Sequence, residues 1–387
     1  MTWIPAAALD SHERPDYRDR MFRDAVKSHE GRRNRRRARL LARRPLFAGL
    51  ALSKLTPFGL TLFGLTLFGL ALFGPALAQD GPVDAPVRVV ATVGMVGDTA
   101  ATIGGACTDV VSLMGPGVDP HLYQATSGDV RQLSRADLIL YGGLTLEGQL
   151  GDVLERLGER TSTLAVSEAG VPAERRIRVS SAYGVDPHVW MDVSLWAGTL
   201  EPIAAALAEL APGCAEGVRE RAAAHDAELG ALHDWIDEAV ATVPEANRVL
   251  VTAHDAFAYY GRAYGLDVVG IQGVSTDAEP SIADIRGTAE TIARSGVPAV
   301  FIETTINPRT IQAVLDATAD MGASVELGGT LYSDAMGEPG TAEGTYIGML
   351  HANTVAIVGA LGGEVPPLPS ALHAWADRYG IADRTAP

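Results

Sequence analysis

Residues 214–243 have the sequence CAEGVRERAAAHDAELGALHDWIDEAVATV, and this stretch decides the architecture. Side chains that favour burial recur in it at spacings of three and four: Val218, Ala222, His225, Leu229, Leu232, Ile236 and Val240. Such spacing places them on one face of a helix, and no proline interrupts the stretch before Pro244. The pattern predicts a single helix of about 27 residues, roughly 40 Å long at 1.5 Å per residue.

Short apolar runs alternate with helical patterns on both sides of this helix. Strands are expected before it at 88–93, 110–114, 138–141 and 163–166, and after it at 248–252, 266–271, 299–302 and 325–327. Helices between and after the later strands are expected at 257–264, 282–294, 309–321 and 346–361. Alternation of this kind is typical of βαβ units with parallel sheets. The sequence therefore predicts two α/β lobes joined by one long helix.

The first 78 residues are expected to direct export. A positive cluster at 31–44 precedes an uncharged run that ends in Ala76-Leu77-Ala78, which is the order of a secretory signal. We expect cleavage after Ala78 and a periplasmic location, although the length of the apolar run leaves an uncleaved membrane anchor open. The expected division is an N-terminal extension and signal peptide at 1–78, a first lobe at 79–213, the linking helix at 214–243 and a second lobe at 244–387.

Charge is distributed unevenly between these parts. Residues 1–78 hold 14 of the 31 Lys and Arg but 6 of the 47 Asp and Glu, which leaves 17 Arg, 41 acidic residues and a net charge of −24 for 79–387. This balance argues against a nucleic-acid partner, whose phosphates need Lys and Arg patches. The acidic residues could favour the approach of cations, or they could simply form a solvated surface. The two cysteines, Cys107 and Cys214, could pair after export or stay as buried thiols.

The pentapeptide Gly-Val-Asp-Pro-His occurs twice, at 117–121 and 184–188. In each copy the glycine permits a tight turn, and the proline fixes its own φ and pushes the preceding aspartate into an extended conformation. Each copy thus presents one histidine on a stiff loop, which suits a metal site because the ligand geometry must be preset. His121 and His188 are therefore candidate metal ligands.

Two further candidates follow strands of the second lobe. His254 comes after the strand expected at 248–252, and Asp334 comes after the strand expected at 325–327. Open α/β sheets bind ligands beyond the carboxyl ends of their strands. We therefore expect each lobe to bring two ligands to a shared cleft.

Three aspartates stand beside these candidates: Asp119, Asp186 and Asp255. Carboxylates next to metal-binding histidines commonly orient the rings, whereas aspartates in such loops also stabilise turns. Both roles stay open for all three.

At these residues the chain resembles the zinc/manganese (TroA-like) periplasmic solute-binding proteins of metal ABC transporters. The matching segments are MGPGVDPHLY (114–123), DPHVWMD (186–192), VTAHDAF (251–257), GIQGVSTDAEP (270–280), LYSDAMG (331–337) and GTYIGML (344–350). The resemblance implies two lobes, each a four-stranded parallel sheet with flanking helices, joined by a rigid backbone helix. Position by position, His121, His188, His254 and Asp334 match the four metal ligands of the family.

The resemblance also implies a function. The chain is expected to capture one Zn²⁺ or Mn²⁺ ion, with Fe²⁺ less favoured, and to deliver it as a monomer to a membrane permease served by a separate ATPase. Three imidazoles and one carboxylate suit four-coordinate Zn²⁺, whereas binding through both oxygens of Asp334 would give five ligands and suit Mn²⁺ better. Zinc-devoted members often carry a His-rich loop between the first two ligands, and residues 122–187 contain no His.

Two other classes of protein could use the same ligands. A zinc-dependent hydrolase would need an open metal position and a general base such as Glu279 or Glu303, but a fourth protein ligand would fill that position. A metal-stabilised adhesion module would hold an ion that never exchanges. The chain contains no G-x-x-x-x-G-K-[ST] motif, so we do not expect it to hydrolyse ATP.

Overall fold

The computed structural model describes residues 85–180 and 184–381. The described residues belong to one compact unit. The expected signal peptide, its cleavage after Ala78 and the alternative membrane anchor lie outside the described residues. Across the two described ranges, no helix has the length and apolar character needed to cross a bilayer.

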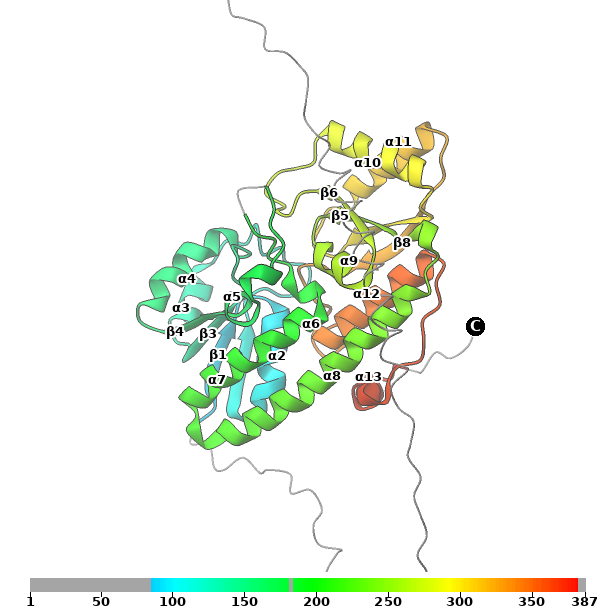
Figure 1. Cartoon of the computed structure of the whole chain (residues 1–387). Helices are drawn as coiled ribbons and strands as arrows, with labels where there is room; N and C mark the ends of the chain where they lie inside the picture. The colour runs from blue at the N-terminus through cyan, green and yellow to red at the C-terminus, as the bar shows by residue number, and fades with distance from the viewer. Residues whose placement is uncertain (1–84, 181–183, 382–387) are drawn as a thin grey trace, which may run out of the picture. The chain divides into compact units, whose positions relative to one another are not determined.

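The first lobe (residues 87–210) is built on a parallel sheet with the strand order β2-β1-β3-β4. Helix α2 packs on β1 and β2, and α7 and α8 pack against α2 (Figure 1). The elements are β1 (Val87–Ala91), α2 (Gly94–Gly104), β2 (Thr108–Ser112), α3 (Ser127–Leu133), β3 (Leu138–Tyr141), α4 (Gly151–Gly158), β4 (Ser162–Ala165), α5 (Val166–Gly170), α6 (Val193–Trp196) and α7 (Leu200–Leu210). The four strands expected in this lobe are all present.

Strand β2 begins two residues earlier than the sequence suggested. It is an edge strand whose five side chains are half-buried or exposed, so hydrophobicity does not mark its ends. Its limits follow from its pairing with β1, which joins Val87 to Thr108 and Ala91 to Ser112.

The predicted linking helix is present as α8 (Ala215–Ala241), which has 27 residues. Figure 1 shows it extending from the first lobe to the second, and it contacts α2, α7, α9 and α12. Leu229, Leu232, Ile236 and Val240 of its predicted stripe are buried. Burial of each such side chain stabilises the fold by roughly 1.5–3 kcal/mol, so both lobes pack firmly on one rigid element.

Cys107 and Cys214 form a disulfide bond, which decides between the two states that the sequence left open. The bond joins the residue before β2 to the residue before α8. Close by, the Arg221 side chain donates to the main-chain oxygens of Ile103 and Gly104. The beginning of α8 is thereby fastened to the first lobe.

The second lobe (residues 249–360) contains the four expected strands, arranged as two parallel hydrogen-bonded pairs, β5-β6 and β7-β8. The α/β class is as predicted, but the four strands do not form one continuous ladder. β5 and β7 lie next to each other, and at their carboxyl ends the His254 amide donates to the Glu303 side chain at 2.8 Å instead of to a main-chain oxygen. The strands lie between the α10–α11 pair and α12 (Figure 1).

The elements of this half have the following bounds: β5 (Val249–His254), α9 (Ala258–Tyr264), β6 (Asp267–Gln272), α10 (Ile282–Ser295), β7 (Ala299–Glu303), α11 (Arg309–Asp320), β8 (Glu326–Leu331), α12 (Tyr346–Ala360) and α13 (His373–Tyr379). Local sequence sets the ends of α10. Ser281 and Asp284 form a reciprocal capping box at its start, and Gly296 ends it in the left-handed conformation.

Strand β8 extends four residues beyond the predicted Leu327 because it contains a bulge. Val300 pairs with Leu327 and Phe301 pairs with Gly329, which leaves Gly328 as the extra residue. A Cβ atom at Gly328 would lie 2.6 Å from the Phe301 ring, so the ring can pack there only against glycine. The strand ends at Leu331, which brings Asp334 within three residues of its carboxyl end.

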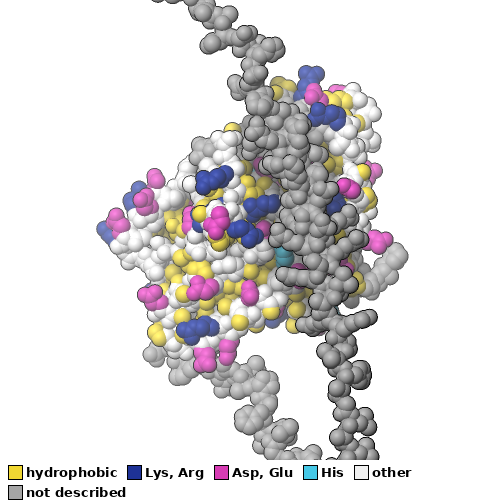
Figure 2. Space-filling view, viewed as in Figure 1, with side chains coloured by type: hydrophobic (Ala, Val, Ile, Leu, Met, Phe, Trp, Pro, Cys, Tyr) yellow, Lys and Arg dark blue, Asp and Glu magenta, His cyan; other side chains and the backbone are white. Residues whose placement is uncertain are grey.

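Acidic and basic side chains are scattered over the face of the molecule shown in Figure 2. On this face neither sign of charge gathers into a continuous patch. The distribution fits a solvated surface, which is one of the two interpretations that the net charge allowed.

Candidate metal centre

The four predicted ligands converge on one buried point. His121, His188, His254 and Asp334 are each at most 1% exposed, and one nitrogen or oxygen from each lies within 4.8 Å of those of the others. The first two come from loops of the first lobe, as expected. His254 is the last residue of β5 rather than a residue beyond it.

The distances between these atoms have the size expected around a small cation. Asp334 Oδ1 lies 3.2 Å from His188 Nε2, and Asp334 Oδ2 lies 3.2 Å from His254 Nε2 and 3.7 Å from His121 Nε2. The two Nε2 atoms of His121 and His188 are 3.4 Å apart. Ligands on a tetrahedral ion with bonds of about 2.1 Å are separated by roughly 3.4 Å, so the group fits such an ion.

Several of these atoms lack the partners that buried polar atoms normally have. Within the described part of the chain, His254 Nε2 and both Asp334 oxygens are buried and make no hydrogen bond of acceptable geometry. Orphaned buried polar atoms are costly. A cation bound among them would satisfy all of them at once, which supports the site on grounds independent of the motif.

Two of the imidazole rings are held by carboxylates on the side away from the centre. His188 Nδ1 lies 2.7 Å from Asp186 Oδ1, and His254 Nδ1 lies 2.5 Å from Glu303 Oε2. Contacts of this type fix the ring orientation and leave Nε2 directed at the metal position. The contact between Asp186 and His188 is the one that the sequence suggested.

The sequence indicates Glu303 only as a candidate base of a hydrolase, and the structure gives it an orienting role instead. It ends β7, beside the carboxyl end of β5, and it also accepts the main-chain N–H of His254. The general position of binding residues at carboxyl ends of strands was the signal that could have identified it. Both of its oxygens are engaged with His254, which leaves it poorly placed to activate a water molecule.

Asp119 and Asp255 are used differently from Asp186. Asp119 Oδ1 accepts the His121 main-chain N–H at 2.9 Å, and Asp119 Oδ2 accepts a hydrogen bond from Thr276 Oγ1 at 2.6 Å. Burial raises the pKa of the Asp255 carboxyl, and the neighbouring Asp186 carboxylate raises it further. No described contact joins the Asp255 carboxyl to an imidazole ring.

The three histidines differ in charge state as well as in position. Burial lowers the pKa of His121 to about 3, so its ring is neutral at physiological pH. Burial also disfavours the charged form of His188, but Asp186 and Asp334 outweigh it and raise the pKa to about 9. The pKa of Asp334 is held well below its usual range, because His254 and His188 outweigh the effect of burial.

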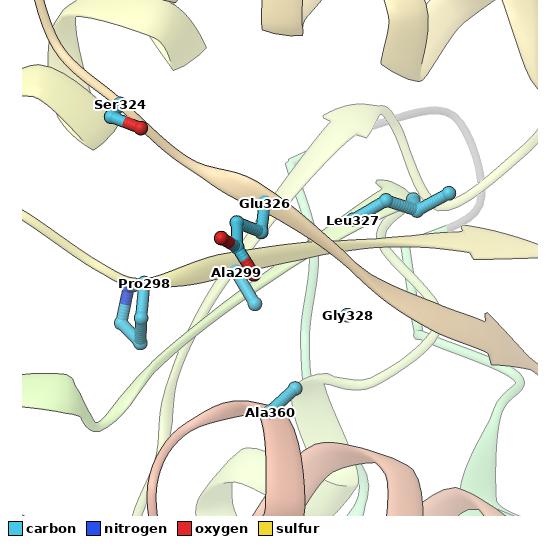
Figure 3. Close-up of a pocket in the computed structure, with 7 residues that line it drawn as sticks. All are labelled: Pro298, Ala299, Ser324, Glu326, Leu327, Gly328 and Ala360. Atoms are coloured by element: carbon cyan, nitrogen blue, oxygen red, sulfur yellow. The ribbon is translucent and has the colours of Figure 1, made fainter.

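A hollow of about 610 Å³ lies at the amino-terminal ends of β7 and β8 (Figure 3). Ala299 and Glu326 begin those strands and line the hollow, together with Leu327 and the end of α12 at Ala360. Glu326 is its one charged lining residue. The hollow is therefore separate from the four-residue site, which lies near the carboxyl ends of the strands.

Comparison with known proteins agrees with this geometry. Residues 89–360 match the family model described as zinc-uptake complex component A, periplasmic (ZnuA). The manganese-binding lipoprotein MntA of Bacillus subtilis is 43% identical over 278 residues, covering 72% of this chain and 90% of the relative. The iron-binding protein YfeA of Yersinia pestis is 31% identical over 291 residues, covering 74% and 91%.

The zinc-binding protein TroA of Treponema pallidum is 44% identical over 284 residues, covering 73% of this chain and 92% of the relative. Its solved structure superposes with a TM-score of 0.70 and covers 72% of this chain and 99% of that one. The family model covers well over half of the 387 residues. With its two lobes, long α8 and buried His₃Asp group, the chain belongs to the ZnuA family of periplasmic zinc-uptake components.

Proposed function

We propose that this chain is the extracytoplasmic receptor of a metal ABC importer, which captures one Zn²⁺ or Mn²⁺ ion between its lobes. His121, His188, His254 and Asp334 bind the ion. The observation that carries the proposal is the spacing of their ligand atoms, with four distances of 3.2–3.7 Å among buried groups. The family consists of metal-uptake components rather than enzymes, and the four protein ligands leave no open position for a hydrolytic water.

The site supports both metals. Three imidazole nitrogens and one carboxylate oxygen make a four-coordinate site for Zn²⁺. Asp334 turns one oxygen toward His188 and the other toward His254, so it can also supply two oxygens and raise the number of ligands to five for Mn²⁺. The relatives are named for manganese, zinc and iron. Fe²⁺ therefore remains the third candidate.

The family supports the partners and the location that we propose. The loaded receptor delivers its ion, as a monomer, to a membrane permease driven by a separate ATPase. Residues 1–78 direct export and are removed after Ala78. The functional division is then a first metal-binding lobe at 79–213, a linking helix at 214–243 and a second metal-binding lobe at 244–387. The Cys107–Cys214 bond supports an oxidising compartment.

The proposal is tested by calorimetric titration of the metal-stripped full-length chain with Zn²⁺ and Mn²⁺. We expect one tight site per chain that is severely weakened by His121→Ala and by Asp334→Ala. His373→Ala is a suitable control, because His373 is exposed on α13 and contacts the main-chain oxygen of Leu368. Absence of stoichiometric binding, or equal affinity in all three variants, would overturn the proposal.

A further inference from the structure

The two loops that carry the pentapeptides are attached to the second lobe in different ways. The His188 loop (residues 186–192) is buried at every position. Tyr259 Oη donates to the Asp186 main-chain oxygen at 2.9 Å, and Trp190 Nε1 donates to the main-chain oxygen of Ser333 at 3.0 Å. Tyr346 Oη donates to the Trp190 main-chain oxygen at 2.6 Å. This loop is fixed inside the protein next to Asp334.

The His121 loop (residues 115–122) lies at the surface. Residues 115–117 are exposed, Asp119 is half-buried, and Leu122, directly after the ligand, is 47% exposed. The hydrogen bond from Thr276 Oγ1 to Asp119 Oδ2, 2.6 Å long, ties this loop to the second lobe. The other oxygen of the same carboxylate accepts the main-chain N–H of His121. Movement of the Asp119 side chain therefore moves the main chain of the ligand.

Thr276 is itself connected to another ligand of the site. It lies in the Thr276 loop (residues 273–280), between β6 and α10. Gln272 Nε2 donates to the main-chain oxygens of Thr276 and Ala278 and so closes this loop on itself. Gln272 pairs with His254 in the β5-β6 ladder. A continuous chain of contacts therefore leads from His254 through Gln272, Thr276 and Asp119 to His121.

We propose that the Thr276–Asp119 hydrogen bond is a latch for metal exchange. Metal enters and leaves on the His121 side when the latch opens, while His188, His254 and Asp334 stay assembled as a platform. The inference rests on the proposed function and assigns Thr276 and Asp119 as positioning residues for one ligand.

The physical reason is the difference in the cost of opening. Release of the His188 loop would break three buried hydrogen bonds and expose Trp190, Tyr259 and Tyr346, which are at most 1% exposed. Opening of the His121 loop separates the half-buried Asp119 from Thr276, which is 7% exposed, and water can then replace the lost partner of Asp119. Segments with exposed hydrogen bonds and little buried apolar surface open first.

The latch is tested by the rate at which the metal-loaded full-length chain gives up Zn²⁺ or Mn²⁺ to an excess of chelator after rapid mixing. Thr276→Val removes the hydroxyl and keeps the volume. We expect dissociation to be roughly tenfold faster or more, since hydrogen bonds to charged groups are the strong ones. Thr276→Ser keeps the donor and is expected to stay within about threefold of the unmodified chain.

Two further variants serve as comparisons. Thr288→Val removes a hydroxyl from another buried threonine, on α10, and should leave the rate unchanged. Tyr259→Phe loosens the His188 loop and should lower the thermal stability of the metal-free protein without speeding release.

The remaining outcomes would contradict either the latch or the proposed function. An unchanged or slower rate in Thr276→Val, the same acceleration in Thr276→Ser or Thr288→Val, or acceleration in Tyr259→Phe alone would overturn the latch. Absence of tight metal binding by the unmodified chain would overturn the proposed function instead, and this result is distinct from tight binding with unaltered rates.

Discussion

The two copies of Gly-Val-Asp-Pro-His share a local geometry and differ in their burial and in their contacts with the rest of the protein. The glycines have φ values of 71° at Gly117 and 67° at Gly184. In each copy the aspartate Oδ1 accepts the histidine main-chain N–H at 2.9 Å. Yet one copy is buried throughout its Asp-Pro-His part, while the other has an exposed glycine and a half-buried aspartate and is followed directly by the exposed Leu122.

Only some properties of a ligand loop are therefore set by its own sequence. Five residues are enough to set the turn and to aim the histidine. The neighbours then decide how the carboxylate is used. Asp186 contacts the ring of its own histidine, whereas Asp119 accepts a hydrogen bond from Thr276 in the second lobe.

Removal of either imidazole should lower the affinity for metal more than any other change. His188→Ala and His121→Ala are each expected to weaken metal binding by more than about a hundredfold. This loss exceeds the roughly 10–100-fold loss that is typical when a carboxylate behind a ligand is changed. His188→Ala also leaves the buried Asp186 without its partner, so the metal-free protein should lose about 1–3 kcal/mol of unfolding free energy. Calorimetry and urea unfolding measure the two quantities. Equal destabilisation by both variants would contradict the proposed asymmetry.

The dependence of affinity on pH should distinguish the same two histidines. At pH 7 the His188 ring, with its pKa raised to about 9, carries a proton that metal must displace, whereas the His121 ring, with a pKa of about 3, carries none. The pKa of His254 is also raised, since Glu303 and Asp334 outweigh the effect of its burial. Apparent affinity should therefore rise with pH between about 6 and 8, by up to tenfold per pH unit for each displaced proton.

Titrations in buffers with different ionisation enthalpies count the protons released on binding. Release of protons at pH 7 that persists in His121→Ala would agree with the assignment. Binding without proton release would contradict it.

The two aspartates should differ in their effect on affinity. Asp186→Asn alters the contact that orients the His188 ring and should weaken binding by about 10–100-fold. Asp119→Asn keeps an oxygen for the His121 amide, so its effect on equilibrium affinity should be smaller. Calorimetric titration of both variants measures the difference. A larger loss in Asp119→Asn would show that the surface loop, rather than the buried one, determines affinity.

Replacement of the glycine should have the smallest effect, and its cost in unfolding free energy should be the same in both pentapeptides. Gly117→Ala and Gly184→Ala each force a Cβ into a left-handed conformation and should destabilise the metal-free protein by about 1–2 kcal/mol. A Cβ at Gly117 would meet the Thr304 main-chain oxygen at 3.6 Å, an ordinary contact, and one at Gly184 meets nothing within 4 Å. Denaturant unfolding checks this, and a cost confined to one copy would show that the turns are not equivalent.

Features carried by short motifs or strong periodicity could be predicted from the sequence. The sequence predicts the helix at 214–243 nearly to the residue, because its stripe of burial-prone side chains extends from Val218 to Val240. The four candidate ligands converge as expected. The position of Glu303 at the end of a predicted strand marks it as a candidate, but its contact with His254 depends on how two separate strands pack. The bulge at Gly328 likewise depends on the Phe301 ring, which comes from another strand.

The disulfide between Cys107 and Cys214 makes a covalent ring of the intervening chain. Strands β2, β3 and β4 and both pentapeptides lie inside this ring, whereas His254 and Asp334 lie outside it. A protease that cuts once between residues 122 and 183 would therefore leave the two histidine loops tethered to each other until a reductant opens the ring. The first-lobe half of the site is thus a cyclic segment, and the second-lobe half is held to it by a linear chain.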